Sequence, residues 1–278
     1  MIREKSSGIE YLTFTSLNGI EFIRHAFSTR IGGISTGIYS SMNLGYKRGD
    51  DRDHVDENFR RMAALLKCSP GDFVTGVQTH TVNVRLVTEA DRGKGVIRPV
   101  DYTDTDGLIT NIPGIVLVTF YADCVPLFFV DPVHKAIGLS HSGWRGTVNR
   151  MGKVTIDAMK EHFGTDPADL ICAIGPCICM DCYEVSEDVA DEFMQNFPGC
   201  LLSAGDTLSD HTFLRNKNYD KYLLDLRVAN KLIMLEAGVP SDNIELPGIC
   251  TCCNPDYLFS HRATGGKRGN MGAFLGIK

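Results

Sequence analysis

The feature that most constrains the fold of this chain is a series of three largely apolar segments that lie close together in the sequence. They span residues 115–121, 127–130 and 136–141, and each has the length of a β-strand. A strand with one face in water alternates apolar and polar residues, whereas a strand covered on both faces is apolar at most positions. We therefore predict that these segments form the centre of a sheet that is covered on both faces.

Helical and strand-like patterns on either side of this centre complete the predicted fold. Val55, Phe59, Met62 and Leu66 recur at helical spacing. Strands and helices do not alternate regularly, and no composition break marks a domain boundary. We predict an α/β (α+β) fold in which residues 1–278 form a single domain with mixed β-sheet layers flanked by helices. The predicted helices span residues 53–67, 147–163 and 225–237, and the remaining strands span residues 22–28, 82–87, 170–174 and 271–277.

The composition excludes several classes of partner. Hydrophobic residues make up 43% of the chain and charged residues 22%, which suits a folded protein with a substantial core. The net charge of −6 argues against a nucleic-acid partner, because such proteins present a basic face. The first ten residues lack the apolar run of a signal peptide, and no apolar segment is long enough to span a bilayer. We expect a cytoplasmic protein with no membrane partner.

Three reactive side chains lie where predicted strands begin or end. His80 precedes one strand, Cys124 lies between two of the apolar segments, and His141 ends the third. Two imidazoles and one thiolate suit zinc or copper, and three protein ligands with a fourth position open are typical of a catalytic zinc site. We predict a metal site at His80, Cys124 and His141. Spacing alone fits equally well the alternative of three strand-end residues with satisfied hydrogen bonds.

Two further residues are candidates for the chemistry of this site. Arg145 lies between Gly143 and Gly146, just before a predicted helix whose first N–H groups would be unpaired. A bidentate contact from this arginine would suit phosphate, although a solvated ion pair in a loop fits this segment equally well. Asp123 precedes Cys124 and is a candidate for orienting a histidine ligand.

We expect the ten cysteines of the chain to be free thiols. The chain shows no export signal that would direct it to an oxidising compartment, where disulfides form. Cys172, Cys177, Cys179 and Cys182 have the spacing C-x4-C-x-C-x2-C, and a C-x2-C lies in residues 250–253. Neither stretch matches a zinc-ribbon pattern with two C-x2-C pairs. We therefore expect buried free thiols here rather than a second metal site.

Six short motifs occur in a fixed order along the chain, and together they are specific to one family. The motifs are Gln78-x-His80, Ala122-Asp123-Cys124-x-Pro126, His141-x-Gly143-Trp144-Arg145-Gly146, Ile174-Gly175-Pro176, Cys250-Thr251-x-Cys253 and Ser260-His261-Arg262. With these motifs the chain resembles the bacterial multicopper polyphenol oxidase or laccase-domain family, whose members are better regarded as purine nucleoside phosphorylases. The resemblance extends from residues 28–33 to the last predicted strand.

This resemblance implies a fold, a metal and a reaction. The fold would be a single α/β domain related to cysteine-hydrolase-like toxin domains. The metal, zinc with copper possible, would be held by His80, Cys124 and His141. The reaction would convert adenosine, inosine, guanosine or methylthioadenosine and phosphate into the free base and the sugar 1-phosphate, with adenosine deamination as a side activity. The relatives are described as cytoplasmic, and one branch is implicated in editing peptidoglycan precursors.

The chain departs from the family pattern at two arginine positions. If the arginines of the relatives hold phosphate, their loss would weaken or alter the phosphorylase activity, unless Arg268 compensates locally. Where relatives carry Asn-Arg-Arg-Arg, Ser-Tyr/His-Arg-Arg and Thr-Gly-Arg, this chain has Asn58-Phe59-Arg60-Arg61, Ser260-His261-Arg262-Ala263 and Arg268-Gly269-Asn270.

Other functions compete with the phosphorylase. A multicopper laccase needs several copper centres and many histidines, whereas this chain has eight histidines and no His-x-His pair. A cysteine hydrolase acting on peptidoglycan precursors would use Cys124 as a nucleophile activated by His141. A non-catalytic metal-binding protein is the third alternative.

Overall fold

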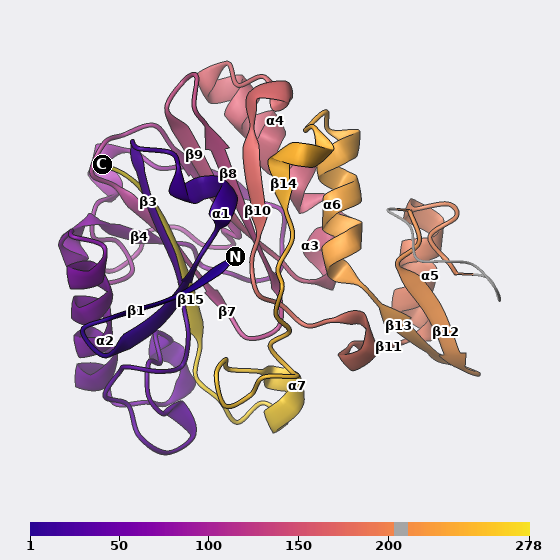
Figure 1. Ribbon diagram of the computed structural model, residues 1–278, viewed down its shortest axis with the longest axis horizontal. Coiled ribbons are helices and arrows are strands. Elements are labelled where there is room, and N and C mark those ends of the chain that lie inside the picture. The colour runs from indigo at the N-terminus through magenta and orange to yellow at the C-terminus, as the bar shows by residue number, and fades with distance from the viewer. Residues whose placement is uncertain (203–210) are drawn as a thin grey trace.

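Two six-stranded mixed sheets form the centre of the protein, which we describe from a computed structural model (Figure 1). The structure describes residues 1–202 and 211–278. The first sheet has the order β1 (Ile2–Ser6), β2 (Ile9–Thr13), β3 (Ile23–Ser28), β15 (Met271–Ile277), β7 (Val116–Tyr121), β4 (Phe73–Thr75). The second has the order β14 (Ile244–Glu245), β10 (Ile171–Ile174), β8 (Val125–Asp131), β9 (Ala136–Ser142), β6 (Gly107–Thr110), β5 (Val84–Leu86).

The apolar segments are buried on both faces because the two sheets pack against each other and helices cover their outer faces. Between the sheets, Leu117 of β7 packs in one cluster with Phe128 of β8 and Leu139 of β9. Neighbouring residues on the same strands point the other way: Val118 packs beneath α2, and Phe129 belongs to the cluster beneath α4 and α6. The prediction of covered strands at residues 115–121, 127–130 and 136–141 is confirmed.

Helices lie on both outer faces (Figure 1). Asp51 caps α2 (Arg52–Leu65) by accepting from the N–H of Asp53, and Asp225 caps α6 (Leu226–Glu236) in the same way. Among the described residues, no helix has the length and apolar character needed to cross a membrane. The remaining helices are α1 (Thr15–Asn18), α3 (Trp144–Val148), α4 (Met151–Phe163), α5 (Glu187–Asn196) and α7 (His261–Thr264).

The structure corrects the predicted helix over residues 147–163. Two helices, α3 and α4, lie there, and they are separated at Arg150, whose backbone is left-handed with φ of 61°. Trp144 and Arg145 are therefore helical rather than part of a loop. The other predicted helices and strands are confirmed, with shifts of one or two residues at most of their ends.

A small third sheet was not predicted. It consists of β11 (Glu184–Ser186), β13 (Lys221–Leu224) and β12 (Leu214–Asn218) and lies next to α5, at the right of Figure 1. The strand β12 is exposed at four of its five positions and carries mostly polar residues, so it lacks the apolar alternation that identifies a strand.

A buried amide joins α2 to the preceding loop. The Asn58 side chain is fully buried and donates hydrogen bonds to Ser35 Oγ and to the carbonyl oxygens of Ser41 and Asn43, at 2.8–3.2 Å. Its Oδ1 accepts from the N–H of Ile34 at 3.0 Å. One side chain thus satisfies several groups that water cannot reach.

We predict that Asn58→Ala lowers the free energy of unfolding by about 2–4 kcal/mol, because Ile34 and Ser41 lose a buried partner. The measurement is urea unfolding of the variant and the parent protein. Arg60→Ala is the matched control on the same helix: its side chain is 58% exposed and forms a surface ion pair with Glu57. Its effect should stay within about 0.5 kcal/mol. Equal midpoints for the two variants would contradict this role of Asn58.

Candidate metal and substrate site

His80, Cys124 and His141 come from three different segments and meet at one end of the second sheet. Cys124 lies in the turn between β7 and β8, His141 near the end of β9, and His80 in the segment between β4 and β5. Their candidate ligand atoms all lie within 4.8 Å of one another, and His80 Nε2 is 4.0 Å from Cys124 Sγ. His141 is buried, Cys124 half-buried and His80 exposed. The predicted juxtaposition of these three residues is confirmed.

The antiparallel pairing of β8 with β9 explains this convergence. Pro126 is opposite His141 and Val125 opposite Ser142, which places Cys124 beside Gly143. A Cβ on Gly143 would lie only 2.9 Å from His80 Cδ2 and 3.2 Å from Cys124 Sγ. Glycine suits this position, because the backbone that follows β9 approaches both side chains closely.

Asp106, which was not predicted as a site residue from the sequence, orients the site. Its carboxylate is fully buried, and its Oδ1 lies 2.8 Å from His141 Nδ1. The same carboxylate accepts hydrogen bonds from the backbone N–H groups of Thr79, His80 and Thr81 at 3.0–3.1 Å. One buried acid thus fixes the ring of His141, leaves the Nε2 of His141 for a metal, and holds the backbone of His80 in place.

The side chain of Gln78 joins the His80 segment to the first sheet. Its Nε2 donates to the carbonyl oxygen of Phe120 at 2.8 Å, and its Oε1 accepts from the N–H of Phe120 at 2.7 Å. This pair of bonds imitates the pairing of one strand with another. It explains why glutamine precedes His80 by two residues in the Gln78-x-His80 motif.

Cys124 and His141 shift each other's pKa in opposite directions. Desolvation opposes ionisation of the Cys124 thiol, but the charges and hydrogen bonds of His141 and His80 outweigh it and lower the pKa to about 6. Burial also opposes protonation of His141, but Cys124 and Asp106 raise the pKa of this imidazole to about 9. A thiolate is the form of cysteine that binds metals or attacks an electrophile.

Asp123 is placed differently from the prediction that it orients a histidine. Its carboxylate accepts from Thr251 Oγ1 at 2.6 Å and from the N–H of Arg262 at 2.7 Å, and its carbonyl oxygen accepts from the N–H of Ile178 at 3.0 Å. Its backbone is left-handed, with φ of 101°, which non-glycine residues rarely adopt. Asp123 therefore holds the turn that carries Cys124, and Asp106 orients the histidine.

A cavity of about 670 Å³ opens over the three residues. Apolar side chains that include Val96, Ile97 and Phe120 line it together with polar groups. This volume lies within the range of about 300–1,000 Å³ typical of small-molecule sites. The cavity is therefore large enough for a ligand of nucleoside size.

Four arginines line the same cavity: Arg48, Arg52, Arg98 and Arg268. Arg48 donates to the carbonyl oxygen of Gly266 at 3.1 Å, and Arg268 bonds to Asn270 Oδ1. The Nε atoms of Arg48 and Arg268 are buried without a hydrogen-bond partner. Burial and the neighbouring charge of Arg48 lower the pKa of Arg268 to about 10. Two adjacent guanidinium groups with unused donors are suited to an anionic ligand.

The other arginines considered from the sequence lie elsewhere. Arg145 is exposed on α3, and its guanidinium lies 4.3 Å from the ring centroid of Trp144. Arg60 and Arg61 bond to Glu57 on α2. Phe59, which replaces an arginine of the family pattern, is fully buried in the core. Arg48 was not singled out from the sequence, because nothing in its local pattern distinguishes it from a surface arginine.

Comparison with known proteins gives consistent matches over most of the chain. A family model described as multi-copper polyphenol oxidoreductase laccase matches residues 24–278. The purine nucleoside phosphorylase YlmD of Bacillus subtilis is 35% identical over 265 residues, which cover 95% of this chain and 91% of that protein. A protein named adenosine deaminase RL5, from an unknown prokaryotic organism, is 34% identical over 272 residues, which cover 97% of this chain and 98% of the relative.

Solved structures agree with these matches. The crystal structure of YlmD from Geobacillus stearothermophilus superposes with a TM-score of 0.87 at 34% identity, covering 99% of this chain and 98% of that one. The crystal structure of Bacillus licheniformis hypothetical protein YfiH gives a TM-score of 0.88 at 32% identity, covering 98% and 97%. The chain therefore belongs to the family described as multi-copper polyphenol oxidoreductase laccase.

Proposed function

We propose that this protein is a purine nucleoside phosphorylase with adenosine deaminase as a side activity. The observation that carries the proposal is a single cavity that joins the His80, Cys124 and His141 group to the paired guanidiniums of Arg48 and Arg268. The names of the relatives, purine nucleoside phosphorylase and adenosine deaminase, support both reactions. The substrates would be adenosine, inosine, guanosine or methylthioadenosine together with phosphate.

The three residues fit a metal ion of the zinc type, with copper as the alternative. Two imidazoles and a thiolate form a common catalytic ligand set, and Asp106 supplies the hydrogen bond that such a histidine usually makes. His80, Cys124 and His141 would hold the ion. An ion bound there would supply an activated water for deamination of adenosine, since it lowers the pKa of bound water to about 7.

Phosphorolysis places a different demand on the cavity. The bond between the sugar C1′ and the purine nitrogen breaks, and a phosphate oxygen forms a new bond to C1′. Arg48 and Arg268 would bind the phosphate and hold it against the sugar, so that positioning and charge stabilisation supply most of the rate increase. The apolar part of the wall, which includes Phe120 and Val96, would cover the purine and exclude water.

One specific observation supports a second candidate function. The lowered pKa of Cys124 beside His141 is also what a cysteine nucleophile requires. A cysteine hydrolase acting on peptidoglycan precursors is therefore the alternative function. The resemblance also implies a fold related to cysteine-hydrolase-like toxin domains, and this relationship remains a prediction. A polyphenol oxidase would need several copper centres, whereas the group of His80, Cys124 and His141 offers one metal position.

We also infer a cytoplasmic enzyme formed by one domain over residues 1–278, with no nucleic-acid or membrane partner.

We predict that Cys124→Ala abolishes phosphorolysis of adenosine and inosine and lowers bound zinc by about one ion per chain. Alanine offers neither a ligand nor a nucleophile in place of the thiolate. The measurements are separation of bases after anaerobic incubation with phosphate, and metal analysis of the purified variant. Cys68→Ala is the control, because this half-buried cysteine does not line the cavity. Parental rates in a folded Cys124→Ala protein would exclude both roles of this residue.

Alkylation of the thiol separates the two roles of Cys124. A thiolate bound to a metal is protected from iodoacetamide until a chelator removes the ion, whereas a free nucleophile reacts at the same rate with and without the chelator. Labelling of Cys124 is followed by mass spectrometry. Labelling of Cys124 that does not depend on the chelator would support the cysteine-nucleophile alternative.

Arg268→Ala should raise the KM for phosphate by about ten- to a hundredfold, because a charge-assisted hydrogen bond contributes about 1.5–3 kcal/mol. Deamination of adenosine uses water in place of phosphate and should change much less. Steady-state kinetics of both reactions in one variant control for damage to the purine pocket. Arg145→Ala is the comparison, since that residue was the candidate for phosphate binding from the sequence. An increase confined to Arg145→Ala would reverse our assignment, and equal losses in both reactions would remove the phosphate role.

A further inference from the structure

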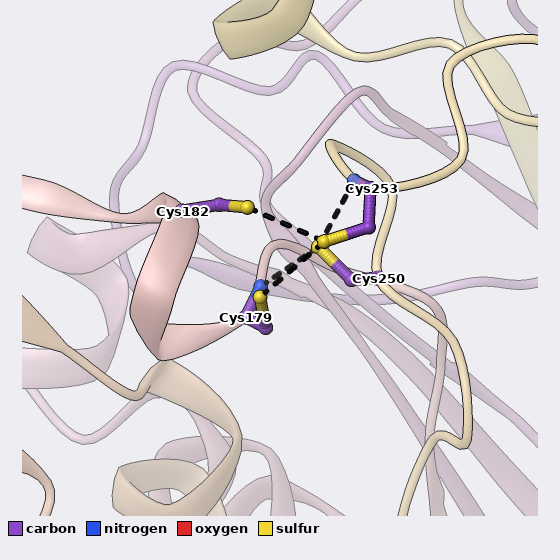
Figure 2. A group of neighbouring side chains, drawn as sticks. All are labelled: Cys179, Cys182, Cys250 and Cys253. Atoms are coloured by element: carbon purple, nitrogen blue, oxygen red, sulfur yellow. Dashed lines mark hydrogen bonds between the residues drawn. The ribbon is translucent and has the colours of Figure 1, made fainter.

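Four cysteines outside the cavity converge from two segments that are distant in sequence. Cys179 and Cys182 lie in the segment that follows β10, the latter at the end of a short 3-10 helix (Met180–Cys182). Cys250 and Cys253 lie in the segment that follows β14. Each segment thus contributes one C-x2-C pair, and Figure 2 shows the four side chains directed toward a common point.

The distances within this cluster are those of a metal-ligand set rather than of a disulfide. All four sulfur atoms lie within 4.8 Å of one another, and Cys253 Sγ is 3.4 Å from Cys182 Sγ and 3.9 Å from Cys179 Sγ. A disulfide requires about 2.05 Å between sulfurs. Four thiolates around zinc at about 2.3 Å lie about 3.8 Å apart, as tetrahedral geometry requires. The observed separations are close to that value.

Backbone N–H groups already point at one of the sulfurs. Cys250 Sγ accepts from the N–H of Cys179 at 3.2 Å and from the N–H of Cys253 at 3.5 Å. Cys250 is buried, whereas Cys253 is exposed and the other two are half-buried. The expectation of buried free thiols therefore does not describe this cluster.

We propose that Cys179, Cys182, Cys250 and Cys253 bind one zinc ion in a closed structural site. Binding displaces the thiol protons to solvent and leaves four sulfur ligands with no open position. Spacing within one segment does not identify this site, because each C-x2-C pair needs the other. The parallel bridge between Cys177 and Cys250 brings the two segments together.

The site would position the catalytic turn through Asp123. The segment with Cys179 donates the Ile178 N–H to the carbonyl oxygen of Asp123, and the segment with Cys250 donates the Thr251 hydroxyl to its carboxylate. Zinc bound by both segments would fix these donors relative to each other. Asp123 adjoins Cys124, so the four-cysteine site would act on the reaction at a distance, as a positioning element.

Metal content of four purified proteins tests the proposal. Each is kept reduced without a chelating thiol, and zinc is measured after denaturation. The parent protein should hold about two ions per chain and Cys179→Ser/Cys253→Ser about one. The matched control Cys252→Ser changes a neighbouring cysteine outside the cluster and should hold about two. His80→Ala/Cys124→Ser should hold about one, so that failure at one site is distinguished from failure at the other.

A measurement on the intact cluster keeps the test decisive if Cys179→Ser/Cys253→Ser does not fold. Cobalt replaces zinc in His80→Ala/Cys124→Ser, and strong thiolate-to-cobalt charge-transfer absorption with the d–d bands of a tetrahedral site is expected. Iodoacetamide should label the four cysteines together, and only after the metal is removed. Equal zinc in the parent, Cys252→Ser and Cys179→Ser/Cys253→Ser proteins would overturn the proposal. So would cobalt spectra without thiolate bands, or iron in place of zinc.

Discussion

The face-to-face packing of two sheets is the constraint on which the candidate site depends. β7 belongs to the first sheet and β8 to the second, so the turn that joins them crosses from one layer to the other. Both strands are buried on both faces, and close packing leaves them little freedom to shift. Cys124 lies in that turn, and the pairing of β8 with β9 brings His141 beside it. Apolar packing therefore sets the separation between a thiol and an imidazole.

Two buried carboxylates fix the positions of the site residues within the packed sheets. Burial of a carboxylate costs free energy unless hydrogen bonds or charges compensate for it. Asp106 is compensated by His141 and by three backbone N–H groups, and Asp123 by Thr251 and the N–H of Arg262. Each acid is stable in its position only when segments from different parts of the chain are in place. The charged state of the site therefore depends on correct placement of the loops that donate these hydrogen bonds.

Features that depend on a local sequence pattern were predicted correctly. Features that depend on contacts between distant segments were missed. The covered strands and the positions of Cys124 and His141 followed from apolar runs and their ends. Asp106 lies in a polar stretch that resembles an exposed loop, although it is fully buried in the structure. Arg48 is separated from Arg268 by most of the chain. The two C-x2-C pairs meet because β14 pairs with β10, and no local spacing reveals that pairing.

The central place of β15 has a consequence for how the chain folds during synthesis. β15 lies between β3 and β7 in the first sheet, and Gly272 donates to Ser28 Oγ across a separation of 244 residues. The ribosome synthesises β3 and β7 long before β15. Until β15 is made, the edge of each strand that pairs with β15 has no partner. Such edges pair readily with other chains, and contacts of long sequence separation form slowly. A nascent chain that stalls before β15 would therefore be a substrate for chaperones, and the turn that carries Cys124 would gain its final support late.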